Sequence, residues 1–228
     1  MTTRLRIRRK NGIALQNEKY DIEMIDHIYY INLSYRKDRN QEILEEIKLL
    51  DPDLKKTTRI NAIKHEDGKI GCAASHKLAV SKAEKTGYEN VLILEDDFVF
   101  DLKLNILEKE ILKMIELDNN YNMFLLDKDV KKSKKLDKNI IEVHYTLNTG
   151  GYIVNKRFYK SLKDCFCDGK KNLEKGGNLP IDVYWNRIMG ENKKIYTTNF
   201  KIGYQRNSYS DINNKLQKND TDNDNNLF

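Results

Sequence analysis

Short apolar runs alternate with segments of helical period along most of this 228-residue chain. Residues 28–33 form an apolar run of strand length, and the apolar residues that follow lie at helical spacing: Ile43, Leu44, Ile47 and Leu50. The alternation continues with strands expected at residues 57–62, 91–94, 123–126 and 140–145 and helices at residues 72–85 and 104–117. Parallel strands need crossover connections, which are usually helices, so this order predicts an α/β fold with a mostly parallel mixed sheet flanked by helices.

The middle of the chain suits one domain, which we expect over residues 26–212. Residues 1–25 begin with basic side chains interleaved with leucine and isoleucine, which indicates a basic extension or an added edge strand; a grip on phosphate or an anionic membrane is the alternative. Residues 213–228 are rich in asparagine and aspartate and predict a disordered tail, because they hold too few apolar groups to offset their ordering entropy. Residues 127–139, crowded with lysine and aspartate, are typical of a mobile surface loop that can cover a site.

The charge balance limits the kinds of partner that this chain is expected to bind, and the cysteines limit the cellular compartment. The 41 basic against 35 acidic residues favour anionic partners such as nucleotides, but a net charge of +6 is too small to imply nucleic acid. No apolar run is long enough for a transmembrane helix, and the first thirty residues lack the apolar core of a signal peptide. Three cysteines cannot all pair in one chain, and no Cys/His spacing is that of a structural zinc site. We therefore expect a cytoplasmic protein with ordinary reduced thiols.

Three acidic residues follow a wholly apolar strand. Residues 91–94 run directly into Glu95, Asp96 and Asp97, and ligands of open α/β sheets bind at the carboxyl ends of the strands. Adjacent carboxylates repel one another unless a cation neutralises them, which favours a hard ion such as Mn²⁺ or Mg²⁺ between Glu95 and Asp97. The same three residues also fit solvated acids in a turn.

Four further motifs accompany this cluster. In chain order, the five motifs are residues 28–33 with Arg36, Asp38 and Arg39; residues 71–76; residues 92–97; residues 180–182; and Gln205 with residues 210–212. Together they resemble glycosyltransferase family 25, which includes bacterial lipooligosaccharide galactosyltransferases and the galactosyltransferase domains of collagen-modifying enzymes. The resemblance implies a Rossmann-like nucleotide-binding fold of the GT-A type, a UDP-hexose donor, a divalent metal and inversion at the anomeric carbon.

The resemblance also implies roles for single residues. The residues expected to bind the nucleotide are Asn32, Arg36, Arg39, Ser75, His76 and Asp96. Amide and guanidinium groups after the first strand suit base, ribose and phosphate, whereas surface charges for the arginines and a packing role for His76 are the alternatives. The resemblance is incomplete at Gly151, where alanine is more usual, and at Lys77, where an apolar residue is more usual. These changes leave the acceptor preference open and also fit an inactive relative that keeps the fold.

An inverting transferase needs one carboxylate to take the proton of the acceptor hydroxyl group. Asp182, at the start of an expected helix, is the candidate base, and a helix N-cap is the alternative reading. Tyr152 and Trp185 are candidates to stack on sugar faces, although either also suits a core. Gln205 is expected to contact the sugar or the acceptor, and Asp211 to complete the metal shell with Glu95 and Asp97.

These observations predict a metal-dependent transfer of galactose or glucose from a UDP-sugar to an acceptor hydroxyl group on a glycan or a hydroxylysine-type protein. The two hexoses differ at one hydroxyl group, whose recognition the sequence does not decide. The alternative is a catalytically silent nucleotide- or carbohydrate-binding module of a glycosylation assembly. A nucleic-acid-binding protein is the third reading, but the chain offers no interleaving of aromatic and basic residues to support it.

Overall fold

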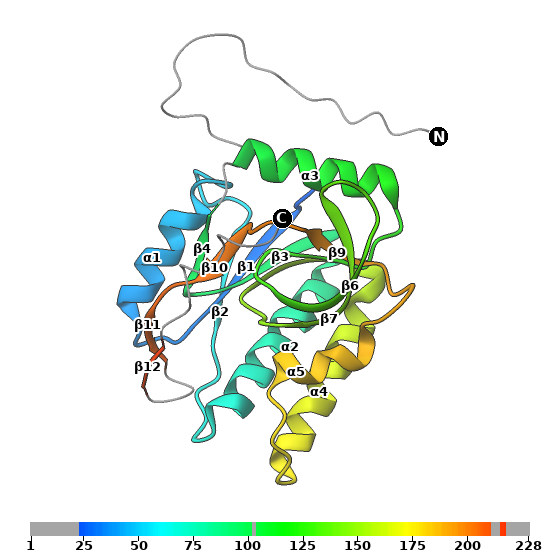
Figure 1. Cartoon of the computed structure of the whole chain (residues 1–228). Helices are drawn as coiled ribbons and strands as arrows, with labels where there is room; N and C mark the ends of the chain where they lie inside the picture. Colours follow the sequence, from blue (N-terminus) through cyan, green and yellow to red (C-terminus); the bar gives the residue numbers. More distant parts are fainter. Residues whose placement is uncertain (1–22, 102–103, 211–214, 218–228) are drawn as a thin grey trace.

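The computed structural model describes residues 23–101, 104–210 and 215–217 (Figure 1). The main sheet has eight strands in the order β2-β1-β3-β8-β5-β9-β7-β6. These strands are β1 (His27–Asn32), β2 (Thr57–Asn61), β3 (Asn90–Glu95), β5 (Met123–Leu125), β6 (Asp129–Lys135), β7 (Ile140–Leu147), β8 (Gly151–Asn155) and β9 (Ile195–Thr198). Residues 1–22 of the expected basic extension and most of the expected tail lie outside the described residues.

The helices are α1 (Lys37–Ile47), α2 (Gly68–Thr86), α3 (Leu104–Leu117), α4 (Tyr159–Glu174) and α5 (Ile181–Tyr184). Two 3₁₀ turns, Lys156–Phe158 and Trp185–Ile188, adjoin α4 and α5. Two small antiparallel pairs complete the described chain: β4 (Phe98–Phe100) with β10 (Gly203–Gln205), and β11 (Ser208–Ser210) with β12 (Lys215–Gln217). None of the described helices is long and apolar enough to cross a membrane.

The main sheet is mixed, with most of its strands pointing the same way. Strand β1 pairs in parallel with β2 and β3, and β5 pairs in parallel with β9. Of the eight strands, β8 and β7 are reversed, because each runs antiparallel to its neighbours on both sides. The predicted mostly parallel mixed sheet is therefore confirmed, and the carboxyl ends of β1, β2 and β3 meet at one edge.

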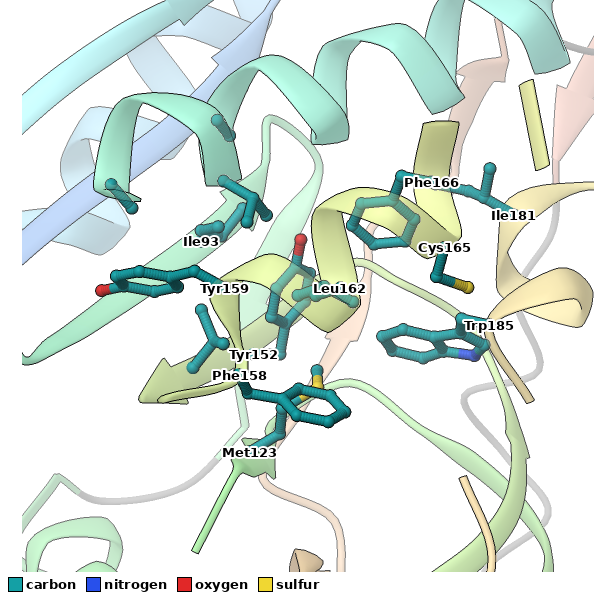
Figure 2. Packing of buried hydrophobic residues seen from close by; sticks show 14 of the residues in the cluster. Ile93, Met123, Tyr152, Phe158, Tyr159, Leu162, Cys165, Phe166, Ile181 and Trp185 are labelled. Carbon is teal, nitrogen blue, oxygen red and sulfur yellow. The ribbon is translucent and has the colours of Figure 1, made fainter. Parts of the chain in front are cut away.

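Helices cover both faces of the sheet, which explains why its central strands are apolar throughout. On β1, Tyr29 and Ile31 pack into one core layer with α2, α4 and α5, whereas Ile28 and Tyr30 pack into another with α1 and α3. Figure 2 shows part of the first layer, with Ile93 of β3 near Tyr152 of β8 and the aromatic residues of α4. Full burial of each large apolar side chain contributes about 1.5–3 kcal/mol, so both layers stabilise the sheet edge that carries the acids.

Helix α2 can pack closely against α4 because its buried face is built from small residues, among them Ala73, Ala79 and Ala83. The helix begins one turn earlier than expected, since the Asp67 carboxylate accepts a hydrogen bond from the Lys69 backbone N–H at 2.9 Å. It ends at Gly87, whose φ of 77° is a left-handed conformation that glycine adopts at little cost.

The expectation of a mobile loop at residues 127–139 is wrong. Most of this segment is strand β6, which pairs antiparallel with β7 at one edge of the sheet. Its lysines mostly point into solvent, and charged side chains on an edge strand discourage pairing with another chain. The lysine-rich segment is therefore an exposed edge strand. A strand pairs through its backbone, so its solvent-facing side chains need not be apolar.

Candidate active site

A pocket of about 310 Å³ lies where β1, β2 and β3 end, within the size range of small-molecule sites. The strand ends, the start of α2, the turn between β7 and β8, and α5 all contribute to its wall. Of the residues expected in the site, those that line the pocket are Arg39, Ser75, His76, Glu95, Asp96, Asp97, Asp182 and Gln205. Asp211 lies outside the described residues.

Arg39 holds both acids that follow β3, Asp96 and Asp97. Its Nη1 atom lies 2.8 Å from Asp96 Oδ1 and 3.3 Å from Asp97 Oδ2, and all three side chains are largely buried. Asn32 donates to the other oxygen of Asp96 at 2.7 Å. The structure therefore brings three of the expected nucleotide-binding residues together, but Asn32 and Arg39 direct donors at Asp96.

Glu95 accepts hydrogen bonds from several sides. The hydroxyl group of Thr149 donates to its Oε1 atom at 2.8 Å, and His76 Nε2 lies 3.1 Å from the same oxygen. Gln205 Nε2 donates to Oε2 at 3.4 Å. Burial by itself raises the pKa of Glu95, but the contacts with His76 and Thr149 outweigh it and bring the pKa below its ordinary value. The ionised form of Glu95 is therefore favoured.

The pKa of Asp97 is shifted in the opposite direction to that of Glu95. Burial, followed by the nearby charge of Glu95, raises the pKa of Asp97 to about 8. Within the described part of the chain, its Oδ1 atom is buried and has no hydrogen-bond partner. An unsatisfied buried carboxylate oxygen beside a second carboxylate is unfavourable unless a cation compensates. The pair thus has the donor set and the excess of negative charge that a hard divalent ion requires.

Asp182 lies in the first turn of α5, and Pro180 occupies the N-cap position. The N-cap reading of Asp182 is therefore wrong. Burial, followed by the charge of Glu95, raises the pKa of Asp182 above its ordinary value, and a backbone N–H of Asn148 donates to the carboxylate and partly offsets this. A half-buried carboxylate with a raised pKa is suited to accept a proton from a substrate.

The turn between β7 and β8 contacts three carboxylates. Asn148, with a φ of 71°, directs its backbone N–H to Asp182, while Thr149 donates to Glu95. The Asn148 side chain donates to Asp127 Oδ1 at 3.4 Å, and a Cβ atom at position 150 would overlap the Asp127 carboxylate. Burial and the charge of Glu95 raise the pKa of Asp127 to about 7. Sequence reasoning missed this turn, although asparagine followed by threonine and glycines is a recognisable turn signal.

A basic and aromatic wall of the pocket was also missed. It consists of Tyr35, Lys64, His65 and Lys69, from the loops after β1 and β2 and the start of α2. The Lys64 ammonium group lies 5.0 Å from the centre of the Tyr35 ring. Positive charge on this wall faces a pocket that also holds four acids, a combination that suits a ligand with both anionic and cationic parts.

Two expected nucleotide contacts have local roles in the structure. Ser75 donates to the Gly71 carbonyl at 2.7 Å and accepts from the Ile63 backbone N–H at 2.8 Å, so it joins α2 to the preceding loop. Arg36 pairs with Asp38 at 2.8 Å and does not line the pocket. This ion pair lowers the pKa of Asp38 to about 2.

The structure corrects the expected role of Tyr152 and Trp185. Both side chains are fully buried in the core layer of Figure 2, and their rings meet edge to face at 5.8 Å. Neither ring presents a face on which a sugar can stack. The hydroxyl group of Tyr152 instead lies 3.0 Å from His76 Nδ1. Tyr152 does not line the pocket itself but contacts His76, which does. Residue type did not separate the two roles, because large aromatic residues suit cores and sugar sites alike.

Comparisons with solved structures give distant likenesses. They include A197 from STIV (12% identity, TM-score 0.45, 86% of this chain and 95% of that chain). Mannose-1-phosphate geranyltransferase from Thermus thermophilus has 11% identity and a TM-score of 0.44, over 80% of this chain and 74% of that chain. A glycosyltransferase involved in the glycosylation of the major capsid of PBCV-1 has 17% identity and a TM-score of 0.40, over 62% and 66%. No curated protein sequence matches.

A family model gives the decisive comparison. The model of glycosyltransferase family 25, described as an LPS biosynthesis protein, matches residues 8–185. The match spans most of the chain and includes the three acids at the end of β3, the turn between β7 and β8, and Asp182. The expected resemblance is therefore confirmed, and the chain belongs to glycosyltransferase family 25.

Proposed function

We propose that the protein is an inverting, metal-dependent glycosyltransferase that moves galactose or glucose from a UDP-sugar to an acceptor hydroxyl group. The acceptor we propose is a glycan or a hydroxylysine-type protein. Membership of a glycosyltransferase family supports glycosyl transfer as such. The observation that carries the finer proposal is that one pocket holds both a buried pair of acids and a separate carboxylate with a raised pKa, Asp182.

Glu95 and Asp97 are the residues that would hold Mn²⁺ or Mg²⁺. Among the described residues, the buried and unpartnered Oδ1 atom of Asp97 supports this assignment, since hard cations prefer carboxylate oxygens. When bound, such an ion supplies positive charge that offsets the charge of the departing diphosphate. Asp211 remains the third proposed ligand.

Asp182 is the proposed base. Its carboxylate would take the proton from the acceptor hydroxyl group while the acceptor oxygen forms its bond to the anomeric carbon. The bond to the UDP oxygen breaks on the opposite face of the sugar, so one displacement inverts the centre and no enzyme nucleophile is needed. A raised pKa makes Asp182 a stronger base than an ordinary aspartate, which supports this role.

The nucleotide would lie between Arg39 and the basic and aromatic wall. Lys64 and Lys69 can meet phosphate charge, and Tyr35, half of whose surface is exposed, offers a ring face that a base can stack on. His76 and Asp96 line the same pocket, but their present partners are protein groups. We therefore propose that they position Glu95 and Arg39 for the nucleotide.

UDP release from a panel of UDP-sugars, with and without Mn²⁺, tests this function. We expect metal-dependent turnover of one donor by the wild type and none by Asp97→Asn, and an exposed acid on α4 gives the matched control, Asp168→Asn. Tight UDP binding without turnover of any donor would favour the catalytically silent module instead.

A further inference from the structure

Cys72 lies beside His76 and Glu95 in the pocket wall. Cys72 and His76 are four residues apart on α2, so their side chains share one face of the helix, and Glu95 ends the neighbouring strand β3. The Cys72 sulfur, a ring nitrogen of His76 and a carboxylate oxygen of Glu95 all lie within 4.8 Å of one another. We propose that these three residues form a binding site for a borderline-soft divalent ion such as Zn²⁺.

The donor set selects the kind of ion. Zn²⁺ binds thiolate, imidazole and carboxylate ligands, whereas Mg²⁺ and Mn²⁺ favour oxygen. This site therefore differs in ligand type from the oxygen site proposed at Glu95 and Asp97. All three residues line the pocket, so an ion that they hold would be reached through the pocket. Three protein ligands with one open position are the pattern of an accessible zinc site.

Outer contacts hold two of the ligands in place. The Tyr152 hydroxyl group lies 3.0 Å from His76 Nδ1, and Nε2 of the same ring lies 3.1 Å from Glu95 Oε1. When Nδ1 carries the proton and donates it to Tyr152, the lone pair of Nε2 is available to a metal. Thr149 donates to Glu95 and fixes its carboxylate. Hydrogen-bond partners that orient the ligand side chains in this way are typical of metal sites in proteins.

Binding needs no redox step. A bond forms between the Cys72 sulfur and the ion, and the thiol proton leaves to solvent. Glu95 belongs to this site and to the proposed site for Mn²⁺ or Mg²⁺, so a Zn²⁺ ion held by Cys72 and His76 would compete with the other ion for the shared carboxylate. We therefore expect Zn²⁺ to inhibit glycosyl transfer and added Mn²⁺ to relieve the inhibition.

Cobalt titration of the full chain, without added Mn²⁺, tests the site directly. Co²⁺ bound to a thiolate gives a near-ultraviolet charge-transfer band, and tetrahedral Co²⁺ gives visible bands. We expect both in the wild type, loss of the ultraviolet band in Cys72→Ser, and loss of all bands on adding Zn²⁺. Cys167→Ser is the matched control, because Cys167 is another partly buried free thiol, on α4. Absence of the ultraviolet band from the wild type, or its persistence in Cys72→Ser, would overturn the proposal.

The cobalt spectrum can be recorded without turnover, so it tests the Zn²⁺ site independently of the proposed glycosyl transfer. With an active donor in hand, Zn²⁺ inhibition adds a second readout that does not depend on the spectrum. We expect inhibition of Cys72→Ser to need at least about tenfold more Zn²⁺ than inhibition of the wild type or of Cys167→Ser. Loss of a residue that only hydrogen-bonds to a metal ligand already lowers metal affinity by about tenfold or more, and Cys72 is itself a ligand. Equal inhibition of all three proteins would contradict the site.

Discussion

Thr149 donates its hydroxyl hydrogen to Glu95 Oε1 over 2.8 Å, joining the turn after β7 to the acid at the end of β3. Strand β3 by itself delivers three neighbouring acids whose charges repel. The contact with His76 and the hydrogen bond from Thr149 together favour the ionised form of Glu95, while burial and the charge of Glu95 favour the neutral form of Asp97. The turn thus helps to keep the charge on Glu95.

Thr149→Val should weaken Mn²⁺ binding. Valine keeps the shape of threonine but cannot donate to Glu95, and loss of a hydrogen bond to a metal ligand costs about 10–100-fold in affinity. Isothermal titration with Mn²⁺ measures the change. Thr149→Ser retains the hydroxyl group and should restore most of the affinity; weak binding by both variants would show that the hydroxyl group is not the cause.

Asp97→Asn should change how stability depends on pH in protein freed of metal by a chelator. The pKa of Asp97 is about 8 in the folded state and 3.8 as the ordinary value. As pH rises through this window, the unfolded chain loses the proton first, so the folded state becomes less stable. Urea unfolding at pH 5.5 and pH 9 should show a smaller decline for the variant than for the wild type. An equal decline would point to Asp127, whose pKa of about 7 acts with the same sign.

Asp182→Asn should abolish most turnover and leave donor binding intact. Loss of a general base costs about 10²–10⁴-fold in rate. In the wild type, kcat/KM should fall as pH drops through the raised pKa of Asp182, because only the ionised carboxylate accepts a proton. A pH–rate profile and a UDP-binding titration check both statements. Turnover of Asp182→Asn at the wild-type rate would exclude Asp182 as the base.

Tyr152→Phe should act through His76 and leave sugar recognition unchanged. The ring remains buried, while the lost contact between the hydroxyl group and His76 costs about 0.5–1.5 kcal/mol in the free energy of unfolding. Denaturant unfolding gives this difference, and the KM for the donor should stay at the wild-type value. A large rise in KM with unchanged stability would show instead that the Tyr152 hydroxyl group, and not its ring, contributes to donor recognition.

The spacing of apolar residues predicted the strands and helices in which such residues recur at regular intervals. The strands at residues 28–33 and 91–94 and the helix at 104–117 appear within about two residues of the expected bounds, because both faces of the sheet are buried. The same pattern put the three acids at a ligand-binding edge. Strand β8 was not foreseen: it lies between β3 and β5 in the antiparallel sense, a pairing that no local pattern specifies.

The site was less predictable than the fold. Acids stand out in a sequence when they cluster, but Thr149 and Asp127 are single polar residues that matter only because distant strands bring them beside Glu95. Cys72 and Glu95 illustrate the same limit, since their proximity depends on how α2 lies against β3. Trp185 shows the converse, because an aromatic side chain in a promising motif is part of the core.

The turn of Asn148 and Thr149 serves two chemical tasks from adjacent residues, one directed at Asp182 and the other at Glu95. Under the proposed mechanism, a shift of this short peptide would disturb the base and the metal ligand in the same event. Natural variation at these positions is then expected to affect acceptor activation and donor departure together, within the single displacement.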